Sequence, residues 1–500
     1  MDLIITLISK ICYFLWGDWI HIPLPGSGTL DLPLLVLILV PAGVYFTIRT
    51  GFLQIRMFPD MLRAVLEHAG VSKYAEAAED AESDDKGATV PAGNTPDTAE
   101  TGKKKKRNGI SALQALVVST ATRVGMGNLV GVVAAVSAGG AGAVFWMWVT
   151  ALIGSATAFI EATLAQLHKE KDPLYGGYRG GPAYYIHDWI NSKRKGAPKK
   201  SILAILFALS GLICWCGISQ VVSNSVTSSF ENAFNIPPVY TVSVLVILAA
   251  IIVLRKNATV KVLDVLVPIM AGIYILLTLY MILTNIGQLG TAFKNIFTEA
   301  FGLRQAAAGT FGAVLMNGVK RGLFSNEAGS GSAPCAAAAA EASHPAKVGL
   351  MQAFGVFIDT LLCTCTALIM LVVPESVIVG QEGMGLLQAA MAWHMGEAGV
   401  IFVAAVLWLF SFTTFLGILF YARSNVAYLF GDNWASQTAY KVVALVMLCI
   451  GGLAAYTFVW DLGDVGIGLM TIFNMIALIP LSKQALDSLK DFESKKRLRK

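Results

Sequence analysis

Two short stretches decide the fold, Thr122-Arg-Val-Gly-Met-Gly-Asn128 and Ser325-Asn-Glu-Ala-Gly-Ser-Gly-Ser332. Each places a Gly-x-Gly motif inside a long apolar run, where an interior glycine costs a helix about 1 kcal/mol relative to alanine. Each also carries polar side chains, among them Asn128, Asn326 and Glu327, that suit a lipid-facing helix poorly. Close packing of helices would explain the glycines but not these polar neighbours. The two stretches therefore predict two helices that are interrupted inside an apolar environment.

The composition around these stretches indicates a membrane protein. Of the 500 residues, 55% are hydrophobic and 14% are charged, and the mean hydropathy is +0.65. Soluble proteins, in contrast, average about 25% charged residues. A membrane-spanning helix needs about 20 apolar residues, so the chain has room for about ten to twelve spans. We expect an all-α polytopic membrane protein without a large separate soluble domain.

Apolar runs between polar breaks predict eleven transmembrane helices, of which the second and the seventh are discontinuous. Their ranges are 33–50, 110–138, 142–167, 201–228, 239–254, 262–284, 306–342, 347–373, 399–428, 438–457 and 462–482. The predicted parts of the chain are an amino-terminal part with an interfacial helix, the first span and a disordered cytoplasmic loop (1–109), a first five-helix repeat (110–284), an external loop (285–305), a second five-helix repeat (306–482) and a basic cytoplasmic tail (483–500).

The spacing of the spans predicts an inverted repeat. Adding about 202 residues to the starts of spans two to six reproduces the starts of spans seven to eleven to within a few residues, and five spans per half invert the second half. The first helix of each half carries its Gly-x-Gly motif at a matching depth. The expected architecture is one amino-terminal span followed by a 5+5 inverted repeat.

Basic residues predict the orientation in the membrane. Of the 37 lysines and arginines, only Lys10, Lys294 and Arg304 fall in loops on the side opposite the large basic loops. By the positive-inside rule, the amino terminus lies outside and the carboxyl terminus in the cytoplasm. The polar segment 74–108 has the composition of a disordered loop, and the apolar segment 3–16 that of an interfacial helix on the outer surface.

Several classes of protein are disfavoured by the same residues. The net charge of +5 could indicate a nucleic-acid partner, but the positions of the basic residues are those of loops on one side of a membrane. The cysteine pairs at 214/216 and 363/365 lack the spacing of a zinc site. The six histidines lie mainly in loops, without a metalloprotease motif or a serine nucleophile elbow, so we expect no enzyme. A channel is a rival, but a selectivity filter usually needs repeated rings of carbonyl groups.

Interrupted helices can build a transport site. Unwinding a helix frees backbone amides and carbonyls, which is tolerated in a membrane only where they face protein, a cavity or a ligand. Amides at the start of a half-helix suit a carboxylate, while freed carbonyls together with Asn or Thr oxygens suit sodium. An amino acid and a sodium ion satisfy both halves of this chemistry.

Three segments resemble the alanine or glycine:cation symporters, which share the fold of the sodium-coupled neurotransmitter symporters. They are GNLVGVVAAVSAGGAGAVFWMWVTALIG from Gly127 to Gly154, GVKRGLFSNEAGSGSAP from Gly318 to Pro334 and, with less weight, YFTIRTGFLQ at 45–54. The resemblance covers most of the chain. It implies import of a small neutral amino acid such as alanine, glycine or serine by alternating access across a prokaryotic plasma (inner) membrane, with sodium as the coupling ion and no other cofactor.

The resemblance also implies the site residues. Expected substrate-binding residues are Thr122, Arg123, Gly125, Gly127, Asn128, Phe324, Ser325, Asn326 and Ile418. Expected sodium ligands are Ala121, Val124, Asn128, Thr413 and Thr414. Arg123 and Ile418 depart from the family, whose alanine-selective members carry a smaller polar residue and a tryptophan there. A wider pocket that takes glutamine is therefore an alternative. Coupling to protons instead of sodium is a separate alternative.

Other polar residues inside the predicted spans have two readings each. Gln220 and Asn224 lie one helical turn apart and either line the pocket or form hydrogen bonds between helices. Glu161 and Asp359 either pair structurally or take part in ion or proton binding. Arg123 is expected to pair with an acid, for which Glu327 and Asp359 are candidates. Lys320 and Arg321 are expected to form a structural or gating pair rather than a substrate contact.

Overall fold

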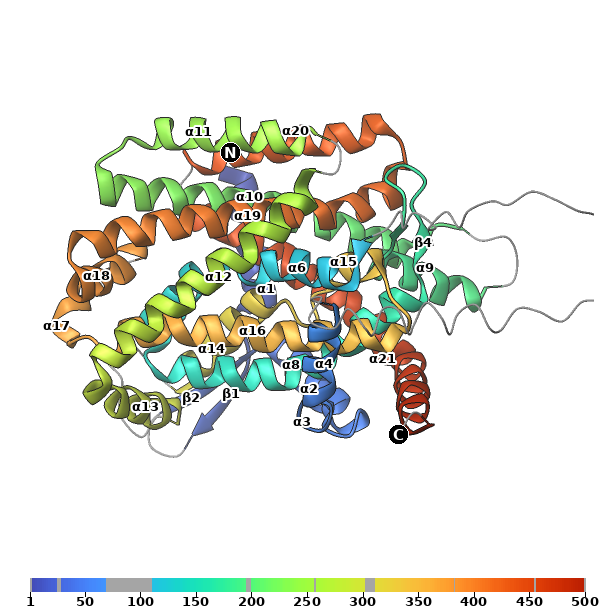
Figure 1. Cartoon of the computed structure of the whole chain (residues 1–500), viewed down its shortest axis with the longest axis horizontal. Coiled ribbons are helices and arrows are strands. Elements are labelled where there is room, and N and C mark those ends of the chain that lie inside the picture. The colour runs from blue at the N-terminus through green and yellow to red at the C-terminus, as the bar shows by residue number, and fades with distance from the viewer. Residues whose placement is uncertain are drawn as a thin grey trace, which may run out of the picture.

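The computed structural model describes residues 2–24, 28–68, 110–194, 199–255, 258–301, 311–381, 383–453 and 456–498. Long helices dominate it and run side by side along its longest axis (Figure 1). The predicted all-α membrane architecture is confirmed. The segment 74–108, predicted to be a disordered loop, lies outside the described residues.

Seven of the described helices are long and apolar enough to cross a membrane. They are α8 (Gly142–Leu167), α10 (Ile202–Phe234), α12 (Ala258–Thr284), α16 (Pro345–Leu371), α19 (Glu397–Phe430), α20 (Trp434–Gly451) and α21 (Tyr456–Leu498). Two shorter apolar helices, α2 (Leu34–Arg49) and α11 (Pro238–Val253), occupy the first and fifth predicted spans.

Both predicted interruptions are present. In the second span, α6 (Ala112–Arg123) is followed by the π-helix η1 (Gly127–Gly131) and α7 (Val132–Gly139), with a bend of 44° at the break. In the seventh span, α14 (Phe311–Asn326) and α15 (Pro334–Ala339) are separated by an irregular segment. Each predicted span thus coincides with one helix or one broken helix, while eleven membrane crossings and the 5+5 symmetry stay predictions.

Several loops contain structure that the apolar pattern did not predict. The helix predicted at 3–16 is present as α1 (Asp2–Trp16). The segment 285–305, predicted to be an external loop, contains α13 (Ile286–Ala300), and the other added elements are the hairpin of β1 (Asp18–Leu24) and β2 (Gly28–Pro33), α3 (Leu53–Arg56), α4 (Phe58–His68), the pair β4 (Glu170–Lys171) and β5 (Tyr178–Arg179), α9 (Pro182–Ser192), α17 (Glu375–Ile378) and α18 (Met384–Met395). These helices are short or amphipathic, so a search for long apolar runs passes over them.

The boundary predicted at 482/483, between the last span and a separate tail, lies inside one continuous helix. Helix α21 continues to Leu498, because the residues after Pro480 include neither glycine nor proline and are mostly good helix formers. Its last turns are tied to the amino-terminal part by ion pairs from Glu493 to Arg56 (2.7 Å) and from Lys496 to Asp60 (2.5 Å).

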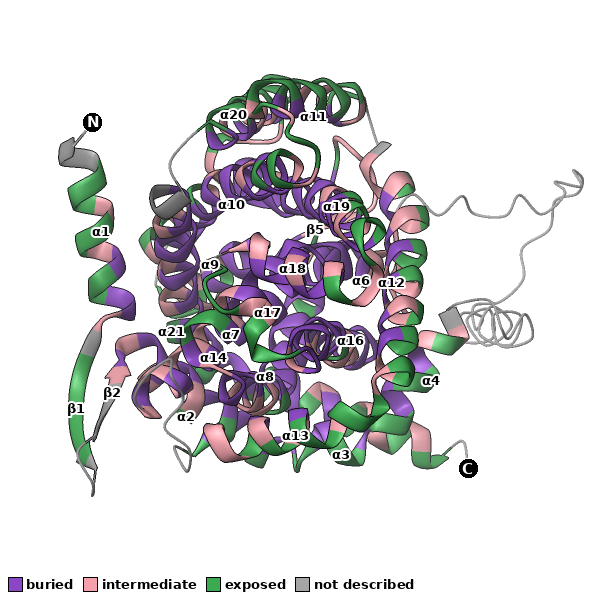
Figure 2. Cartoon of the chain, turned by 90° about the vertical axis from the view of Figure 1, so that its left-hand side faces the viewer, coloured by how far each residue is buried: buried purple, intermediate pink, exposed green. Residues whose placement is uncertain are grey.

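Figure 2 looks along the long helices and separates the buried centre from the periphery. Buried residues concentrate on two helix pairs, α8 with α16 and α10 with α19, and on the elements between them, while α11, α12 and α20 lie outside. The outer helices expose large apolar side chains, such as Ile247 (59% exposed), Leu276 (68%) and Val446 (48%). An apolar exterior of this kind suits contact with lipid. In both views α1 runs across the long helices, not along them.

A short parallel pair of strands joins the two broken helices. Strand β3 (Ile110–Ser111) leads into α6 and pairs with β6 (Ala340–Glu341), which follows α15. The Ser111 hydroxyl accepts a hydrogen bond from the Gln114 amide while the Gln114 side chain accepts one from the Ser111 amide, so the start of α6 is capped. The two interrupted helices are thereby anchored to each other at one end.

Candidate functional site

The first break is short, and side chains satisfy its freed amides. The amide of Gly125 donates to Asn128 Oδ1 (2.9 Å), and the amide of Met126 donates to Thr414 Oγ1 on α19 (3.2 Å). All residues from Ala121 to Gly131 are buried. Because buried amides must find acceptors, these two contacts allow α6 to end without water at this depth.

The two adjacent threonines of α19 have different surroundings. The Thr414 hydroxyl lies 3.4 Å from the Ala121 carbonyl oxygen, at the end of α6. Both hydroxyls donate to the Phe410 carbonyl (2.8 Å from Thr414 and 3.0 Å from Thr413), but the Thr413 hydroxyl otherwise faces the Met270 sulfur on α12 (3.6 Å). Of the two predicted sodium ligands, only Thr414 therefore reaches the break in this conformation.

The second break is longer and has left-handed backbone at three positions. Glu327, Gly329 and Gly331 have φ angles of 56°, 92° and 81°. A Cβ atom at Gly331 would lie 2.7 Å from Pro182 Cγ, and one at Gly329 would lie 2.6 Å from Met475 Cε. Both glycines are thus required by conformation and by space. Glu327 has no such freedom, and a non-glycine residue in this region stores strain that often marks a functional site.

A buried cluster of polar side chains stabilises the second break through hydrogen bonds. The Asn474 side chain of α21 donates to the Gly329 carbonyl (3.0 Å) and to Glu161 Oε1 of α8 (2.5 Å). The Tyr185 hydroxyl of α9 donates to Asn474 Oδ1 (2.5 Å). This arrangement matches the structural reading of Glu161, which supports an unwound carbonyl through an amide.

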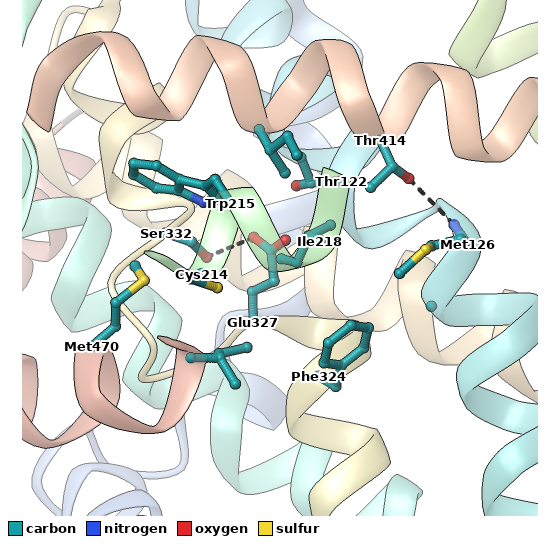
Figure 3. A pocket seen from close by; sticks show the side chains of 13 residues that line it. Thr122, Met126, Cys214, Trp215, Ile218, Phe324, Glu327, Ser332, Thr414 and Met470 are labelled. Carbon is teal, nitrogen blue, oxygen red and sulfur yellow. Dashed lines mark hydrogen bonds between the residues drawn. The ribbon is translucent and has the colours of Figure 1, made fainter. Parts of the chain in front are cut away.

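The two breaks meet at a small cavity between the helices. A Cβ atom at Gly127 would lie 3.3 Å from the Ser325 Cα, so the broken helices touch at this point. The lining residues come from both breaks and from α10, α19 and α21 (Figure 3): Thr122, Met126, Gly127, Cys214, Trp215, Ile218, Phe324, Glu327, Ser332, Thr414, Ile418, Ile467 and Met470.

Among these described lining residues, Glu327 is the one charged side chain. Its Oε2 accepts hydrogen bonds from the hydroxyls of Ser332 (2.7 Å) and Tyr421 (3.3 Å). The Tyr421 hydroxyl also lies 2.6 Å from Thr122 Oγ1. The cavity therefore combines largely apolar walls with one carboxylate and a few hydroxyls, a composition typical of small-molecule sites.

The cavity brings together part of the predicted substrate set. Thr122, Gly127, Phe324 and Ile418 line it, together with the predicted sodium ligand Thr414. Gln220 and Asn224 do not, because their side chains contact Met447 and the Gly451 carbonyl of α20. They follow the second of their two readings, hydrogen bonds between helices. The Asn326 side chain accepts from the Ala328 amide (3.0 Å) and so caps the second break.

Arg123 does not form the expected ion pair with Glu327 or Asp359 among the described residues. It is fully buried, and its Nη1 donates to the carbonyl oxygen and to the side-chain oxygen of Gln352 on α16, both at 3.1 Å. Gly355 leaves room for the guanidinium, since a Cβ there would lie 2.6 Å from Nη1. Arg123 thus packs behind the first break and does not line the cavity.

Asn128 and Ser325 converge on a buried acid outside the cavity. Asp359 Oδ1 on α16 accepts from Asn128 Nδ2 (2.8 Å) and from the Ser325 hydroxyl (2.7 Å), and Cys363 Sγ lies 3.2 Å from both donors. Asn128 also donates to the Asp359 carbonyl (3.1 Å). One acid therefore connects the end of the first break to the start of the second.

The predicted pair of Lys320 and Arg321 has a partner on α21. Lys320 Nζ lies 2.6 Å from Asp464 Oδ2, and Arg321 Nη1 lies 3.7 Å from Asp464 Oδ1. The Arg321 guanidinium stacks over Trp460, which contacts the cavity residue Phe324 with ring centroids 5.2 Å apart. This ion-pair cluster joins α14 to α21 beside the cavity, as a structural or gating contact would.

Most of the apolar residues that line the cavity were not predicted from the sequence. Cys214, Trp215 and Ile218 come from α10, two to ten residues before the two polar residues that were expected there, and Ile467 and Met470 come from α21. These helices are apolar on nearly every side, so the hydropathy pattern contains no signal for the face that meets the cavity.

Comparison with known proteins identifies the family. The model of the sodium:alanine symporter family matches residues 25–82 and 92–500. The probable sodium/glutamine symporter GlnT of Bacillus subtilis is 39% identical over 480 residues, covering 95% of this chain and 91% of that protein. The amino-acid carrier protein AlsT of Bacillus subtilis is 37% identical, covering 92% and 89%. The sodium/alanine symporter AgcS of Methanococcus maripaludis is 32% identical, covering 98% and 97%.

A solved structure shares the fold. The crystal structure of MhsT in complex with L-phenylalanine has a TM-score of 0.52 with 14% sequence identity, covering 74% of this chain and 88% of that chain. At this identity the likeness shows the arrangement of helices and no more. Together with the family match over nearly the whole chain, it establishes that this protein is a secondary transporter of the membrane and belongs to the sodium:alanine symporter family.

Proposed function

We propose that the protein imports a small neutral amino acid together with sodium, and that both bind where the two broken helices meet. The observation that carries this proposal is the cavity between the breaks, which contains one carboxylate and two unwound segments inside an otherwise apolar bundle. Unwound backbone inside a membrane protein is tolerated where it faces protein or a cavity, and transporters bind their substrates at such places. Alternating access then exposes the same site to either side.

The proposed sodium ligands cluster at the end of α6. The Ala121 carbonyl and the Thr414 hydroxyl lie 3.4 Å apart and supply the uncharged oxygens that a hard cation prefers. The carbonyl of Val124, at the break itself, is the third proposed ligand. Asn128 Oδ1 is engaged by the Gly125 amide, so its use for sodium would require that bond to open.

The proposed substrate carboxylate binds at the first break, next to the Gly127 backbone that lines the cavity, where it would take over the Gly125 and Met126 amides from Asn128 and Thr414. The substrate is alanine, glycine or serine, with glutamine as the alternative. The names of the relatives include both alanine and glutamine. Since Arg123 packs away from the cavity, the case for a wider pocket rests on Ile418 alone.

The proposed orientation follows from the basic residues, with the amino terminus outside and the carboxyl terminus in the cytoplasm of a prokaryotic cell. In this orientation the basic end of α21 lies inside. Cysteine accessibility to an impermeant reagent, measured on single cysteines introduced near each terminus of the full chain, would test it. Labelling of the carboxyl-terminal cysteine in intact cells would contradict the proposal.

Uptake into liposomes tests the proposed function. The purified chain is reconstituted, and uptake of labelled alanine, glycine, serine and glutamine is measured with an imposed sodium gradient, with an imposed proton gradient and with neither. We expect sodium-driven uptake that saturates with substrate. Uptake driven by the proton gradient alone would replace sodium with protons as the coupling ion, and flux that does not saturate would favour a channel.

A further inference from the structure

The Glu327 carboxylate is placed as a binding group, not as part of the helix packing. It belongs to a left-handed residue of the second break, and it lines the cavity together with residues of the first break. Figure 3 shows it reaching into the space between Thr122, Ser332 and Trp215. Its Oε2 accepts hydrogen bonds from the Ser332 and Tyr421 hydroxyls, and the Thr122 hydroxyl is a third neighbour of the carboxylate.

The charge of Glu327 has no ionic partner within contact. Arg123 is near enough to attract it, but the guanidinium bonds to Gln352, and no ion pair to Glu327 is formed in the described part of the chain. A buried carboxylate is costly, and the attraction of Arg123 together with neutral hydroxyls offsets that cost only in part without a contacting cation. Strained backbone at the same residue is typical of a functional position, and a carboxylate without an ion pair at the cavity wall suits a cationic ligand.

A zwitterionic amino acid supplies this cation. If its carboxylate binds the amides of the first break, its ammonium group must also lose water inside the cavity and needs an acceptor there. The remaining lining side chains are apolar or carry neutral groups, such as Trp215, Phe324 and Ile418. We propose that Glu327 binds the ammonium group of the substrate, and thereby selects amino acids over other small carboxylates. This inference rests on the proposed function, and it identifies the side chain that recognises the ammonium group of the substrate.

The test compares L-alanine with L-lactate, in which a hydroxyl replaces the ammonium group while the carboxylate and the methyl group stay the same. Inhibition of labelled alanine uptake is measured in liposomes, and the ratio of the lactate to the alanine inhibition constant is the readout. For the unmodified protein we expect a ratio of about 10 to 100, the range that a charge-assisted hydrogen bond gives. A ratio near one would overturn the proposal without any variant.

The variant Glu327→Gln keeps the shape and removes the charge. We expect its ratio to fall to within about threefold of one, while the sodium concentration for half-maximal uptake stays unchanged. Asp359→Asn is the matched control, because it neutralises another buried acid that lies outside the cavity, and it should keep the high ratio. An unchanged ratio in Glu327→Gln, or an equal loss in both variants, would contradict ammonium binding.

Two further measurements separate the other roles of Glu327. Tyr421→Phe removes a hydrogen bond to Oε2 and keeps the charge, so a purely structural role predicts the same loss in this variant, whereas ammonium binding predicts a retained ratio. A tenfold shift in sodium requirement with an unchanged ratio would make Glu327 a sodium ligand and overturn the proposal. If the unmodified protein showed no uptake, the proposed function would fail, and thermal stabilisation of the purified protein by alanine against lactate would still decide the inference.

Discussion

The two broken helices look alike in sequence and differ in structure. Both carry a Gly-x-Gly motif, but only the second motif has glycines in the left-handed region, at Gly329 and Gly331. The first break is bent by 44° and its amides are satisfied by side chains, notably from Asn128 and Thr414. The second is an irregular segment whose glycines make room for α9, α10 and α21.

The difference indicates a division of labour. The first break gathers oxygens around the end of α6 and supplies backbone to the cavity, which suits ion and carboxylate binding. The second carries the charged side chain of the cavity on strained backbone, while Glu161 and Asn474 hold its Gly329 carbonyl from behind. Two similar sequence motifs thus produce an asymmetric site, because the neighbours of each break differ.

The comparison predicts that a methyl group is tolerated far better at Gly127 of the first break than at Gly331 of the second, whereas Gly125 of the first break has no room for one, since its Cβ would lie 1.9 Å from Thr414 Oγ1. Gly331→Ala places a Cβ 2.7 Å from Pro182 Cγ on left-handed backbone, and should lower stability by about 2–5 kcal/mol from strain and overpacking together. Gly127→Ala is the control, since its nearest neighbour would be 3.3 Å away and its backbone is not left-handed. Melting temperatures in detergent measure both, and equal losses would show that the breaks are equivalent.

A second prediction concerns the acids behind the breaks. Asp359→Asn weakens the hydrogen bonds from Asn128 and Ser325, each worth about 1–3 kcal/mol when the acceptor is charged, and should raise the sodium requirement of uptake. Glu161→Gln acts on the second break and should lower the melting temperature while the sodium requirement changes little. Sodium titrations of uptake by the two variants in liposomes measure this difference, and the reverse pattern would refute the assignment.

A third prediction concerns the width of the cavity. Ile418→Trp adds volume to a lining position of α19 and should raise the KM for glutamine by about tenfold or more, since overpacking costs about 1–3 kcal/mol. The KM for alanine should change less, because a smaller substrate leaves more space. Gln220→Ala, on α10 but outside the cavity, is the control. Glutamine transport that is unaffected by the tryptophan would remove the argument for a wider pocket.

The smallest expected effect separates two neighbouring threonines. Thr414→Ala removes the hydroxyl beside the Ala121 carbonyl and should raise the sodium concentration for half-maximal uptake about fivefold, the equivalent of one hydrogen bond of about 1 kcal/mol. Thr413→Ala faces Met270 and should shift it by less than twofold. The same sodium titration measures both variants. A larger shift in Thr413→Ala would mean that another conformation turns its hydroxyl toward the ion.

Much of the fold could be predicted from local patterns. Long apolar runs locate the spans because a bilayer requires them, and the two breaks stand out because glycine and polar residues are costly there. The amphipathic helix α13 escaped notice, as did the continuation of α21 past the last apolar residues. A span is predicted from the length of an apolar run, and neither of these two features contains a long apolar run.

The candidate site was predictable in part, for a related reason. Thr122, Gly127 and Phe324 lie at the breaks themselves, so finding the breaks located these three residues. On the unbroken helices, the family resemblance led to Ile418 and Thr414, which line the cavity. Polarity led to Gln220 and Asn224, whose side chains contact α20. A polar side chain in a membrane helix must find a partner, but the partner is as often another helix as a ligand.

The sequence by itself determined that the chain is a membrane protein with two interrupted helices, because hydropathy and glycine placement act locally along the chain. Only the tertiary structure decided that Glu327 points into the cavity while Arg123 packs behind it, and that Thr414 but not Thr413 reaches the first break. The direction of a side chain in an all-apolar bundle depends on which helices surround it. That information lies in the packing of segments far apart in the sequence, and not in any one of them.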